Sequence, residues 1–237
     1  MTSLLRYDLT DGVATITLDD GKANVLSAPM LQALHGAFDR AEADDAVVLV
    51  TGRAGRFSAG FDLATFQAGP EPLLEMLTLG GTLTERVLAF PRPVVAAVSG
   101  HAIAAGAFIP LAADLRLGAD GPFQIGLNET RIGLTLPAFV QALARERLAP
   151  SWLPRAAICG ELLQGSDAVS AGYLDRIVAS DELMDAARAA ALELRAVEAR
   201  AYAETKLMVR ADVLADVRAG IDAEFTRERF GLATAAA

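Results

Sequence analysis

The chain has 237 residues, 53% of them hydrophobic, and carries 21 basic against 30 acidic residues for a net charge of −9. A chain of this length buries a core that needs no metal, and its single cysteine excludes an intrachain disulfide. The acidic balance excludes general binding to nucleic acid or to anionic lipid, because both repel such a surface. Acidic residues near the start, without an early apolar run, argue against a targeting peptide, so we expect a cytoplasmic protein.

Strands and helices are expected to alternate through the first part of the chain. Leu5–Leu9 and Val13–Leu18 are predicted strands, and the Asp11-Gly12 dipeptide between them is typical of a tight hairpin. Ser27 is expected to cap the helix that follows, in which apolar residues recur at helical spacing. The next expected elements are a buried strand at Ala46–Val50, a loop at Thr51–Leu63, a helix at Leu73–Phe90 and a buried strand at Pro93–Val98.

The second part of the chain begins with another loop of small residues, Gly100–Gly106, and an alanine-rich helix. Its further expected elements are strands at Asp114–Leu117 and Phe123–Ile125 and, from Pro137 onward, mostly helices, the longest at Asp181–Ala199 and Asp212–Arg229. The alternation of strands, helices and small-residue loops predicts a layered α/β protein with buried parallel strands. The uncharged stretch Pro93–Ala113 is long enough to span a membrane, but its Ser-Gly turn and prolines favour a buried strand, a turn and a helix.

Two loops share one design, because Ser58-Ala-Gly-Phe61 and Ala104-Ala-Gly106 each follow a strand and lead into a helix. Small residues let a ligand approach the backbone, and a helix N-terminus has free N–H groups that bind developing negative charge. Two such loops facing one point would form an oxyanion hole. The alternative is that glycine and alanine only permit tight packing of strand on helix.

Glu129 lies between apolar residues directly after a predicted strand. A carboxylate in such a place is partly desolvated, which raises its pKa and makes it a better general base. The alternative is an ordinary loop glutamate that forms an ion pair with Arg131.

A second enzymatic interpretation is a serine hydrolase with Ser58 as nucleophile and His101 as base. Arg56 stands where the nucleophile elbow needs glycine, and the histidine of such enzymes usually comes last in the chain, so this interpretation is disfavoured. With one cysteine and two distant histidines no metal site is predicted, and neither a dinucleotide fingerprint nor a P-loop is present. Three cations could meet phosphates or could be ordinary surface charges: Lys22, Arg53 and Arg56.

Four segments together carry a family resemblance: Lys22-Ala-Asn-Val-Leu26, Phe57-Ser-Ala-Gly-Phe-Asp-Leu63, the run from Pro93 to Gly106, and Gly126-Leu-Asn-Glu-Thr-Arg-Ile-Gly-Leu134. In this order and at this spacing they resemble the crotonase (enoyl-CoA hydratase/isomerase) superfamily. The resemblance implies a spiral core of ββα units, assigned to residues 1–180, and a helical C-terminal trimerisation region at 181–237. It also implies a homotrimer or hexamer.

The same resemblance implies that backbone N–H groups of Phe61 and Ala105 are the oxyanion donors and that Glu129 is the base. The residues that it implies along the acyl-CoA site are Ala23, Val25, Ala59, Gly60, Asp62, Leu63, Ala64 and Phe108. The partner is an acyl-CoA thioester, and no cofactor beyond its CoA moiety is expected.

Two departures from the family pattern bear on the reaction. The second loop usually reads Gly-Gly-Gly, whereas here it is Ala104-Ala105-Gly106. Hydratases of the family hold water with two glutamates, the first of which falls on Phe108 and the second on Glu129. A single base resembles the Δ3,Δ2-enoyl-CoA isomerases, which we expect here. The alternatives are an enoyl-CoA hydratase and a non-catalytic acyl-CoA-binding protein.

Overall fold

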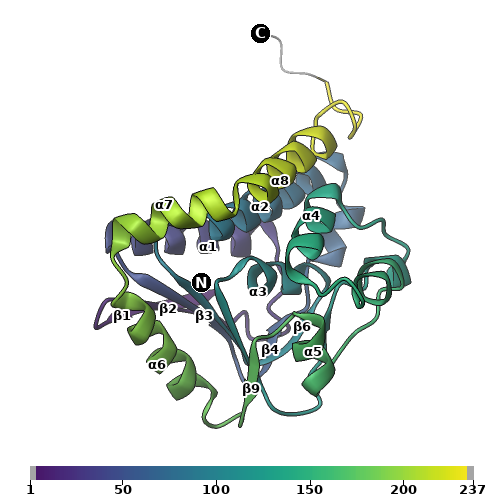
Figure 1. The fold of residues 1–237 in the computed structure, drawn as a ribbon. Helices are drawn as coiled ribbons and strands as arrows, with labels where there is room; N and C mark the ends of the chain where they lie inside the picture. Colours follow the sequence, from purple (N-terminus) through teal and green to yellow (C-terminus); the bar gives the residue numbers. More distant parts are fainter. Residues whose placement is uncertain (1–3, 234–237) are drawn as a thin grey trace.

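Two sheets organise the fold, which a computed structural model describes for residues 4–233 (Figure 1). The larger sheet has the strand order β1-β2-β3-β5-β7-β9, with β1 and β2 antiparallel and every other neighbouring pair parallel. Its strands are β1 (Leu5–Thr10), β2 (Val13–Leu18), β3 (Val47–Gly52), β5 (Val94–Val98), β7 (Leu115–Ala119) and β9 (Arg176–Val178). The smaller, parallel sheet has the order β4-β6-β8, formed by Gly55–Ser58, Gly100–Ile103 and Ile125–Gly126.

The predicted hairpin is confirmed, because β1 and β2 pair antiparallel from Leu5↔Leu18 to Thr10↔Val13. The two turn residues between them both have positive φ, 52° at Asp11 and 71° at Gly12. That is the conformation for which an Asp-Gly dipeptide is suited.

The chain then winds through three similar turns, each giving one strand to the large sheet, one to the small sheet, and a helical segment. The strand pairs are β3 with β4, β5 with β6, and β7 with β8. This is the expected spiral of ββα units, and the α/β fold class is confirmed. The segments Thr51–Leu63 and Gly100–Gly106, expected to be loops, contain β4 and β6. These two strands lack an apolar alternation and form by pairing with each other. They approach so closely that a Cβ on Gly100 would lie 1.9 Å from the Gly55 carbonyl carbon.

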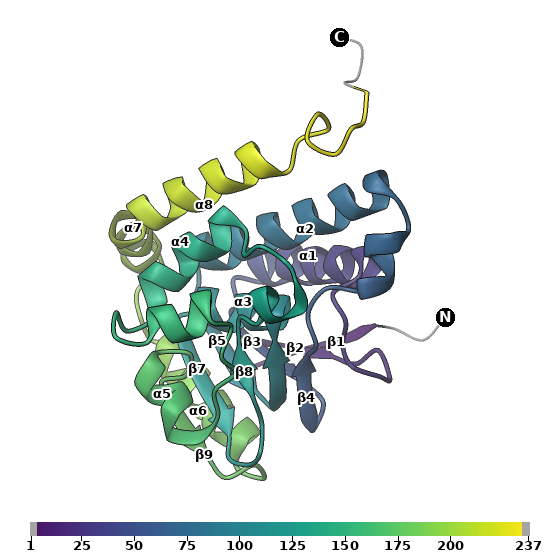
Figure 2. The same cartoon turned by 90° about the vertical axis from the view of Figure 1, so that its right-hand side faces the viewer.

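Eight α-helices in the described residues surround the sheets. They are α1 (Ala28–Ala43), α2 (Pro70–Ala89), α3 (Phe108–Ala112), α4 (Ala138–Arg147), α5 (Gly165–Ala171), α6 (Leu183–Arg195), α7 (Ala199–Val209) and α8 (Ala211–Glu224). Ser27 caps α1 as expected, its side chain accepting from the Met30 N–H. The main core lies between the sheets and helices α1 to α4, while α6 covers the other face of the large sheet. Figures 1 and 2 show α8 lying across α2 and α4.

The C-terminal part differs from the expectation in four places. Strand β9 and helix α7 were not predicted, and the helix expected over Asp181–Ala199 ends at Arg195. The chain starts a new helix because the Glu198 carboxylate caps α7 by accepting from the N–H groups of Arg200 and Ala201. The helix expected over Asp212–Arg229 is α8, which ends at Glu224. No helix in residues 4–233 is long and apolar enough to cross a membrane, and the uncharged stretch forms β5, β6 and α3 as short elements.

Candidate active site

The three groups predicted to act on substrate follow the three strands of the small sheet. Phe61 comes three residues after β4, Ala105 two residues after β6, and Glu129 three residues after β8. Because these strands are parallel neighbours, their carboxyl ends lie at one edge of the sheet. The structure therefore brings the two predicted donor loops and the predicted base to the same edge, where ligands of parallel sheets often bind.

The two donor loops touch at Gly60. This glycine has a φ of 87°, and a Cβ on it would lie 2.8 Å from the Ile103 carbonyl oxygen and 3.2 Å from the Ala105 nitrogen. Each loop leads into a 3₁₀ helix, at Leu63–Gln67 and Ala104–Ala107. The first N–H groups of a helix have no partner within it, so the Ala105 amide in the first turn of the second 3₁₀ helix is available to an oxyanion, whereas Phe61 lies two residues before Leu63.

Ala104 adopts a left-handed backbone with φ 50°, which is unusual for a residue with a Cβ. Such a conformation costs an alanine about 1–2 kcal/mol. Alanine thus occupies this loop in place of glycine by tolerating strain, one residue before the Ala105 amide.

Asn24 holds the first loop in place, a role that the sequence interpretation missed. It is fully buried, and its Nδ2 donates to the carbonyl oxygens of Leu18 and Phe57 at 3.0 and 3.1 Å. Its own carbonyl accepts from the Ser58 hydroxyl at 2.7 Å. Its φ of 52° is a conformation that asparagine tolerates better than most residues, which was the available signal.

Backbone hydrogen bonds join the segment around Asn24 to the first donor loop. The Ala59 N–H donates to the Ala23 carbonyl at 3.0 Å, and the Leu26 N–H donates to the Gly60 carbonyl at 2.8 Å. Predicted substrate-site residues from two distant segments, Ala23 and Val25 with Ala59 and Gly60, are therefore neighbours.

The serine hydrolase interpretation is wrong. The buried Ser58 hydroxyl donates to the Asn24 carbonyl and accepts from the Gly60 N–H. His101 lies on β6 and its Nδ1 accepts from the Gln124 N–H at 3.2 Å. Both side chains are thus engaged with backbone groups instead of with each other.

Glu129 is a desolvated carboxylate at the start of the 3₁₀ helix Glu129–Ile132. It is 6% exposed, and its buried Oε2 has no hydrogen-bond partner among the described residues. The expected alternative of an ion pair with Arg131 is wrong, since the Arg131 Nε donates to the Cys159 carbonyl at 2.9 Å. Burial raises the pKa of Glu129 from its ordinary 4.5 to about 7. A carboxylate with this pKa exchanges protons readily near neutral pH.

Phe108, predicted to line the substrate site, is enclosed by other aromatic rings. The ring is 3% exposed and meets Phe61 and Phe139 edge to face, with centroid distances of 5.9 and 5.5 Å. A ring so enclosed can exclude water but can neither hold nor deprotonate it. Among the other predicted substrate residues, Asp62 caps the 3₁₀ helix through the Ala64 N–H, and Leu63 is 63% exposed.

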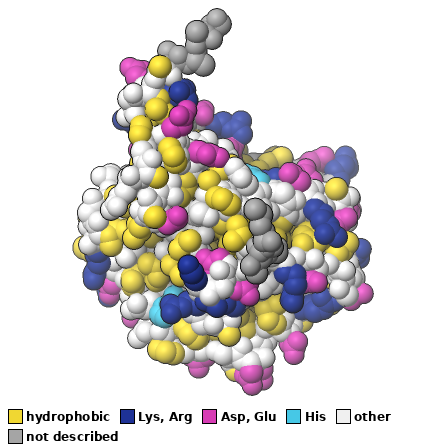
Figure 3. Space-filling model, turned by 180° about the vertical axis from the view of Figure 1, so that it is seen from behind, with side chains coloured by type: hydrophobic (Ala, Val, Ile, Leu, Met, Phe, Trp, Pro, Cys, Tyr) yellow, Lys and Arg dark blue, Asp and Glu magenta, His cyan; other side chains and the backbone are white. Residues whose placement is uncertain are grey.

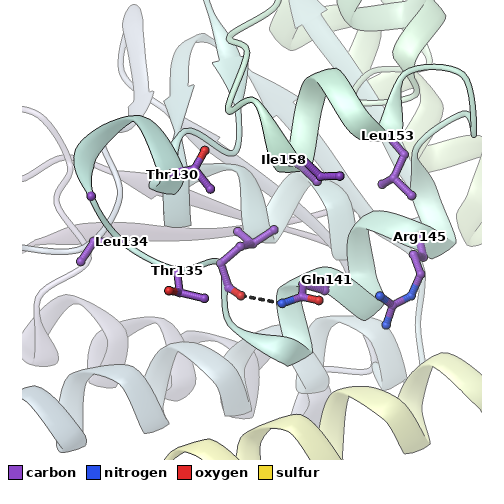
Figure 4. A pocket seen from close by; sticks show the side chains of 10 residues that line it. Thr130, Leu134, Thr135, Gln141, Arg145, Leu153 and Ile158 are labelled. Carbon is purple, nitrogen blue, oxygen red and sulfur yellow. Dashed lines mark hydrogen bonds between the residues drawn. The ribbon is translucent and has the colours of Figure 1, made fainter.

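A cavity of about 540 Å³ lies beside the Glu129 segment (Figure 4). Its wall is partly apolar and partly polar, formed by Thr130, Gly133, Leu134, Thr135, Leu136, Gln141, Arg145, Leu153, Ala157 and Ile158. The Gln141 amide donates to the Leu136 carbonyl at 2.8 Å across one side. Neither Glu129 nor the two donor residues line this cavity, so it adjoins the predicted reaction centre without containing it.

The spiral of ββα turns places two predicted donor loops and a carboxylate at one edge of the small sheet, and this architecture matches a known protein family. The model of the enoyl-CoA hydratase/isomerase family matches residues 8–228. The chain therefore belongs to the enoyl-CoA hydratase/isomerase family.

The names of individual relatives include both enoyl-CoA isomerases and enoyl-CoA hydratases. An enoyl-CoA hydratase/isomerase family protein from Pseudomonas syringae is 42% identical, with a TM-score of 0.92 over 94% of this chain and 96% of its own. A Mycobacterium tuberculosis protein, named an enoyl-CoA isomerase for one of its structures and a probable enoyl-CoA hydratase for another, is 38% identical, with a TM-score of 0.91 over 95% of this chain and 98% of its own. A putative enoyl-CoA hydratase of Thermus thermophilus is 36% identical over 77% of this chain and 74% of its own. The chain spans only 26% of the length of the plant glyoxysomal multifunctional proteins that it also matches.

Proposed function

We propose that the protein is a Δ3,Δ2-enoyl-CoA isomerase with Glu129 as its single base. The carboxylate takes a proton from C2 of a 3-enoyl-CoA, the C3=C4 pair shifts to C2=C3, and the same proton is returned to C4. The N–H groups of Phe61 and Ala105 hold the thioester oxygen of the dienolate formed in between. Each donor is expected to contribute roughly 3 kcal/mol to the transition state. The proton shuttle is expected to contribute about a hundredfold or more.

Two observations carry this proposal: the buried Glu129 has an oxygen without a partner among the described residues, and aromatic Phe108 stands where a second carboxylate would be expected. Hydration needs a water that is both positioned and activated, which two carboxylates do better than one. Isomerisation needs none, and a nearby water would compete for the proton. The enclosed Phe108 ring and the unpaired, buried Glu129 oxygen both favour the reaction without water.

The substrate's CoA is proposed to be the only cofactor-like group, bound along the first donor loop. Lys22 and Arg56 are exposed, and Arg56 lies on β4 beside Asn24, whose Nδ2 donates to its carbonyl oxygen. Figure 3 shows Lys and Arg side chains gathered in a band across one face of the molecule, which supports attraction of an anionic nucleotide despite the acidic net charge. The similarity to proteins of fatty acid β-oxidation supports a place in fatty acid metabolism.

A homotrimer or a dimer of trimers is proposed for the assembly. Apolar side chains of α7 are exposed, with Met208 at 79% and Val209 at 74%, and a contact between copies would cover them. Light scattering at micromolar concentration is expected to give a trimer or a hexamer, and a monomer would contradict the proposal.

The reaction is tested by incubating the purified protein separately with 3-enoyl-CoA and 2-enoyl-CoA and identifying the products. We expect isomerisation to have the higher kcat/KM. A higher kcat/KM for the addition of water to 2-enoyl-CoA would make the protein a hydratase, the reaction named for the Thermus thermophilus relative. Binding of both substrates without turnover would leave an acyl-CoA-binding protein.

A further inference from the structure

Four phenylalanine rings form a continuous chain from the reaction centre to the last helix. Phe61 meets Phe108, Phe108 meets Phe139, and Phe139 meets Phe225, with centroid distances of 5.9, 5.5 and 5.8 Å. The interplanar angles of 81°, 87° and 72° make every contact edge to face, the arrangement that aromatic pairs favour.

Each ring belongs to a different segment of the chain. Phe61 carries one donor amide, and Phe108 begins α3 three residues after the other donor, Ala105. Phe139 lies in the first turn of α4, the helix that follows the Glu129 segment. Phe225 is the C-cap residue that directly follows α8. The chain of rings therefore connects both donors and the base segment to the C-terminal helix.

Close contacts fix the two ends of this chain of rings. The Phe61 ring rests on α2, where a Cβ on Gly80 would lie 2.5 Å from its Cζ. On the next residue, a Cβ on Gly81 would lie 3.4 Å from the Phe225 Cε2. Neighbouring glycines of α2 thus receive the first ring and the last, and a side chain at Gly80 would displace Phe61.

Helix α8 also holds the start of α4 directly. The Glu224 carboxylate accepts from the Ala138 N–H at 2.9 Å, which satisfies a free N–H group of the α4 N-terminus. A Cβ on Gly220 would lie 2.6 Å from the Phe139 nitrogen, so the two helices are in backbone contact there. Since α4 follows the base segment, the position of α8 bears on the position of Glu129.

We propose that Phe225, with Glu224 beside it, is a positioning residue of the active site, acting through Phe139 and Phe108 on the spacing between the donor amides and Glu129. The inference rests on the proposed enolate chemistry. Phe225 is half-buried, and its ring meets Phe139, which separates it from the predicted substrate residue Phe108, so its effect is expected on the spacing of the reacting groups rather than on CoA binding. Packed interiors transmit small shifts because they have few voids to absorb them.

The test compares Phe225→Leu with Phe225→Tyr in the full-length protein. Loss of one edge-to-face contact is expected to lower kcat roughly two- to tenfold while KM stays within about twofold. Phe225→Tyr keeps the ring and is expected to restore kcat. A Phe225→Leu protein with wild-type kcat, or a Phe225→Tyr protein as slow as Phe225→Leu, would overturn the proposal.

A matched control is Phe90→Leu, which removes an edge-to-face partner of Phe38, at 5.2 Å, elsewhere in the main core. It is expected to lower stability but to keep kcat at a temperature where all variants are folded. An equal fall of kcat in Phe90→Leu would mean that Phe225 acts only through stability, and would overturn the proposal. The Phe139→Leu, Phe225→Leu double variant is expected to be no slower than the slower single variant, because both changes break one chain.

A second reaction separates failure of this inference from failure of the proposed function. Exchange of the C2 protons of a saturated acyl-CoA with deuterium from solvent needs only the base and the donors, whichever product the enzyme forms. Exchange that persists without isomerisation would refute the isomerase proposal while still measuring the effect of Phe225. A wild-type protein that neither isomerises nor exchanges would refute both proposals.

Discussion

Two carboxylates of this chain, the half-buried Asp114 and the buried Glu129, have opposite surroundings. Asp114 accepts from the Lys206 Nζ at 2.8 Å, from an Arg210 Nη at 2.9 Å and from the Val94 N–H at 2.7 Å. Glu129 is more deeply buried, but its Oε2 has no partner among the described residues. The first carboxylate is held by charges and a backbone N–H group, whereas the second has this one oxygen without a partner and a pKa that burial raises to about 7.

Charged side chains around Asp114, the Asp114 region, connect distant parts of the chain. Arg210, between α7 and α8, also donates to the Leu88 carbonyl near the end of α2. Arg147, at the end of α4, donates to the Leu111 carbonyl of α3. Cations at helix C-termini are favourable because the helix dipole is negative there. Burial lowers the pKa of Lys206 to about 8, and Asp114 opposes that shift.

The contrast shows two uses of a carboxylate that is withdrawn from solvent. A satisfied one contributes to architecture, because its removal leaves unpaired buried cations. An unsatisfied one lowers stability at neutral pH and persists where proton transfer needs it. The two carboxylates can be separated by substitutions that leave shape nearly unchanged.

The largest effect is expected from Glu129→Gln, which keeps the shape of the side chain but removes the base. Turnover is expected to fall by about 10²–10⁴-fold while acyl-CoA still binds, because the donor loops are untouched. Steady-state kinetics and calorimetric binding of the substrate measure the two quantities. Wild-type-like turnover in the purified variant would show that Glu129 is not the base.

Asp114→Asn is expected to have the opposite profile. Leaving Lys206 and Arg210 without their carboxylate is expected to cost about 3–5 kcal/mol of the free energy of unfolding. The turnover of the folded fraction is expected to stay near the wild-type value. Denaturant titration with a parallel activity assay measures both.

Asp39→Asn provides the control for a surface ion pair, since Asp39 lies 2.6 Å from Arg86 and its side chain is 71% exposed. That change is expected to cost under about 1 kcal/mol. Similar losses in both variants would mean that the Asp114 cluster is no more important than an exposed ion pair.

The pH dependence of stability sharpens the comparison. Glu129 has a pKa of about 7 in the folded chain against an ordinary 4.5, so the folded state binds the proton more tightly. Its contribution to stability is therefore fully present below about pH 4.5 and is lost as the pH rises through 7. Between pH 5 and pH 8 this loss amounts to about 2–3 kcal/mol.

Glu129→Gln removes this titration. The stability of the variant relative to wild type is therefore expected to increase by about 2–3 kcal/mol from pH 5 to pH 8. Denaturant titrations of both proteins at the two pH values measure the difference. A constant difference would show that Glu129 has an unperturbed pKa.

Local chemistry predicted the elements whose determinants lie close together in sequence. The Asp11-Gly12 turn and the Ser27 cap depend on residues within a few positions of each other. Strands β4 and β6 were missed because they have no apolar alternation, and the pairing that creates them joins residues more than 40 positions apart.

Some features of the candidate site could likewise be predicted from neighbouring residues, and others depend on distant segments. The apolar neighbours of Glu129 indicated its desolvation, but the absence of an ion pair with Arg131 depends on Cys159, which another segment brings near. The ion pair of Asp114 with Lys206 spans 92 positions, and no local pattern announces it. The roles of Phe61, Ala105 and Glu129 came from the family resemblance and stay predictions.

The smallest expected effect concerns backbone strain in the second donor loop. Ala104 has a φ of 50°, whereas glycine adopts this conformation without a steric cost. Ala104→Gly should release about 1–2 kcal/mol of strain and lose about 0.5–1 kcal/mol to the greater freedom of glycine in the unfolded chain. A net gain of about 0.5–1 kcal/mol in the free energy of unfolding is therefore expected. Ala107→Gly, at a φ of −86° in the same segment, releases no strain and is expected to lose stability. Turnover should persist in Ala104→Gly because the proposed donor is the amide of Ala105. A variant less stable than wild type would mean that contacts of the Ala104 methyl group compensate the backbone strain. The partnerless oxygen of Glu129 would then be the remaining destabilising feature that distinguishes the active site from the Asp114 region.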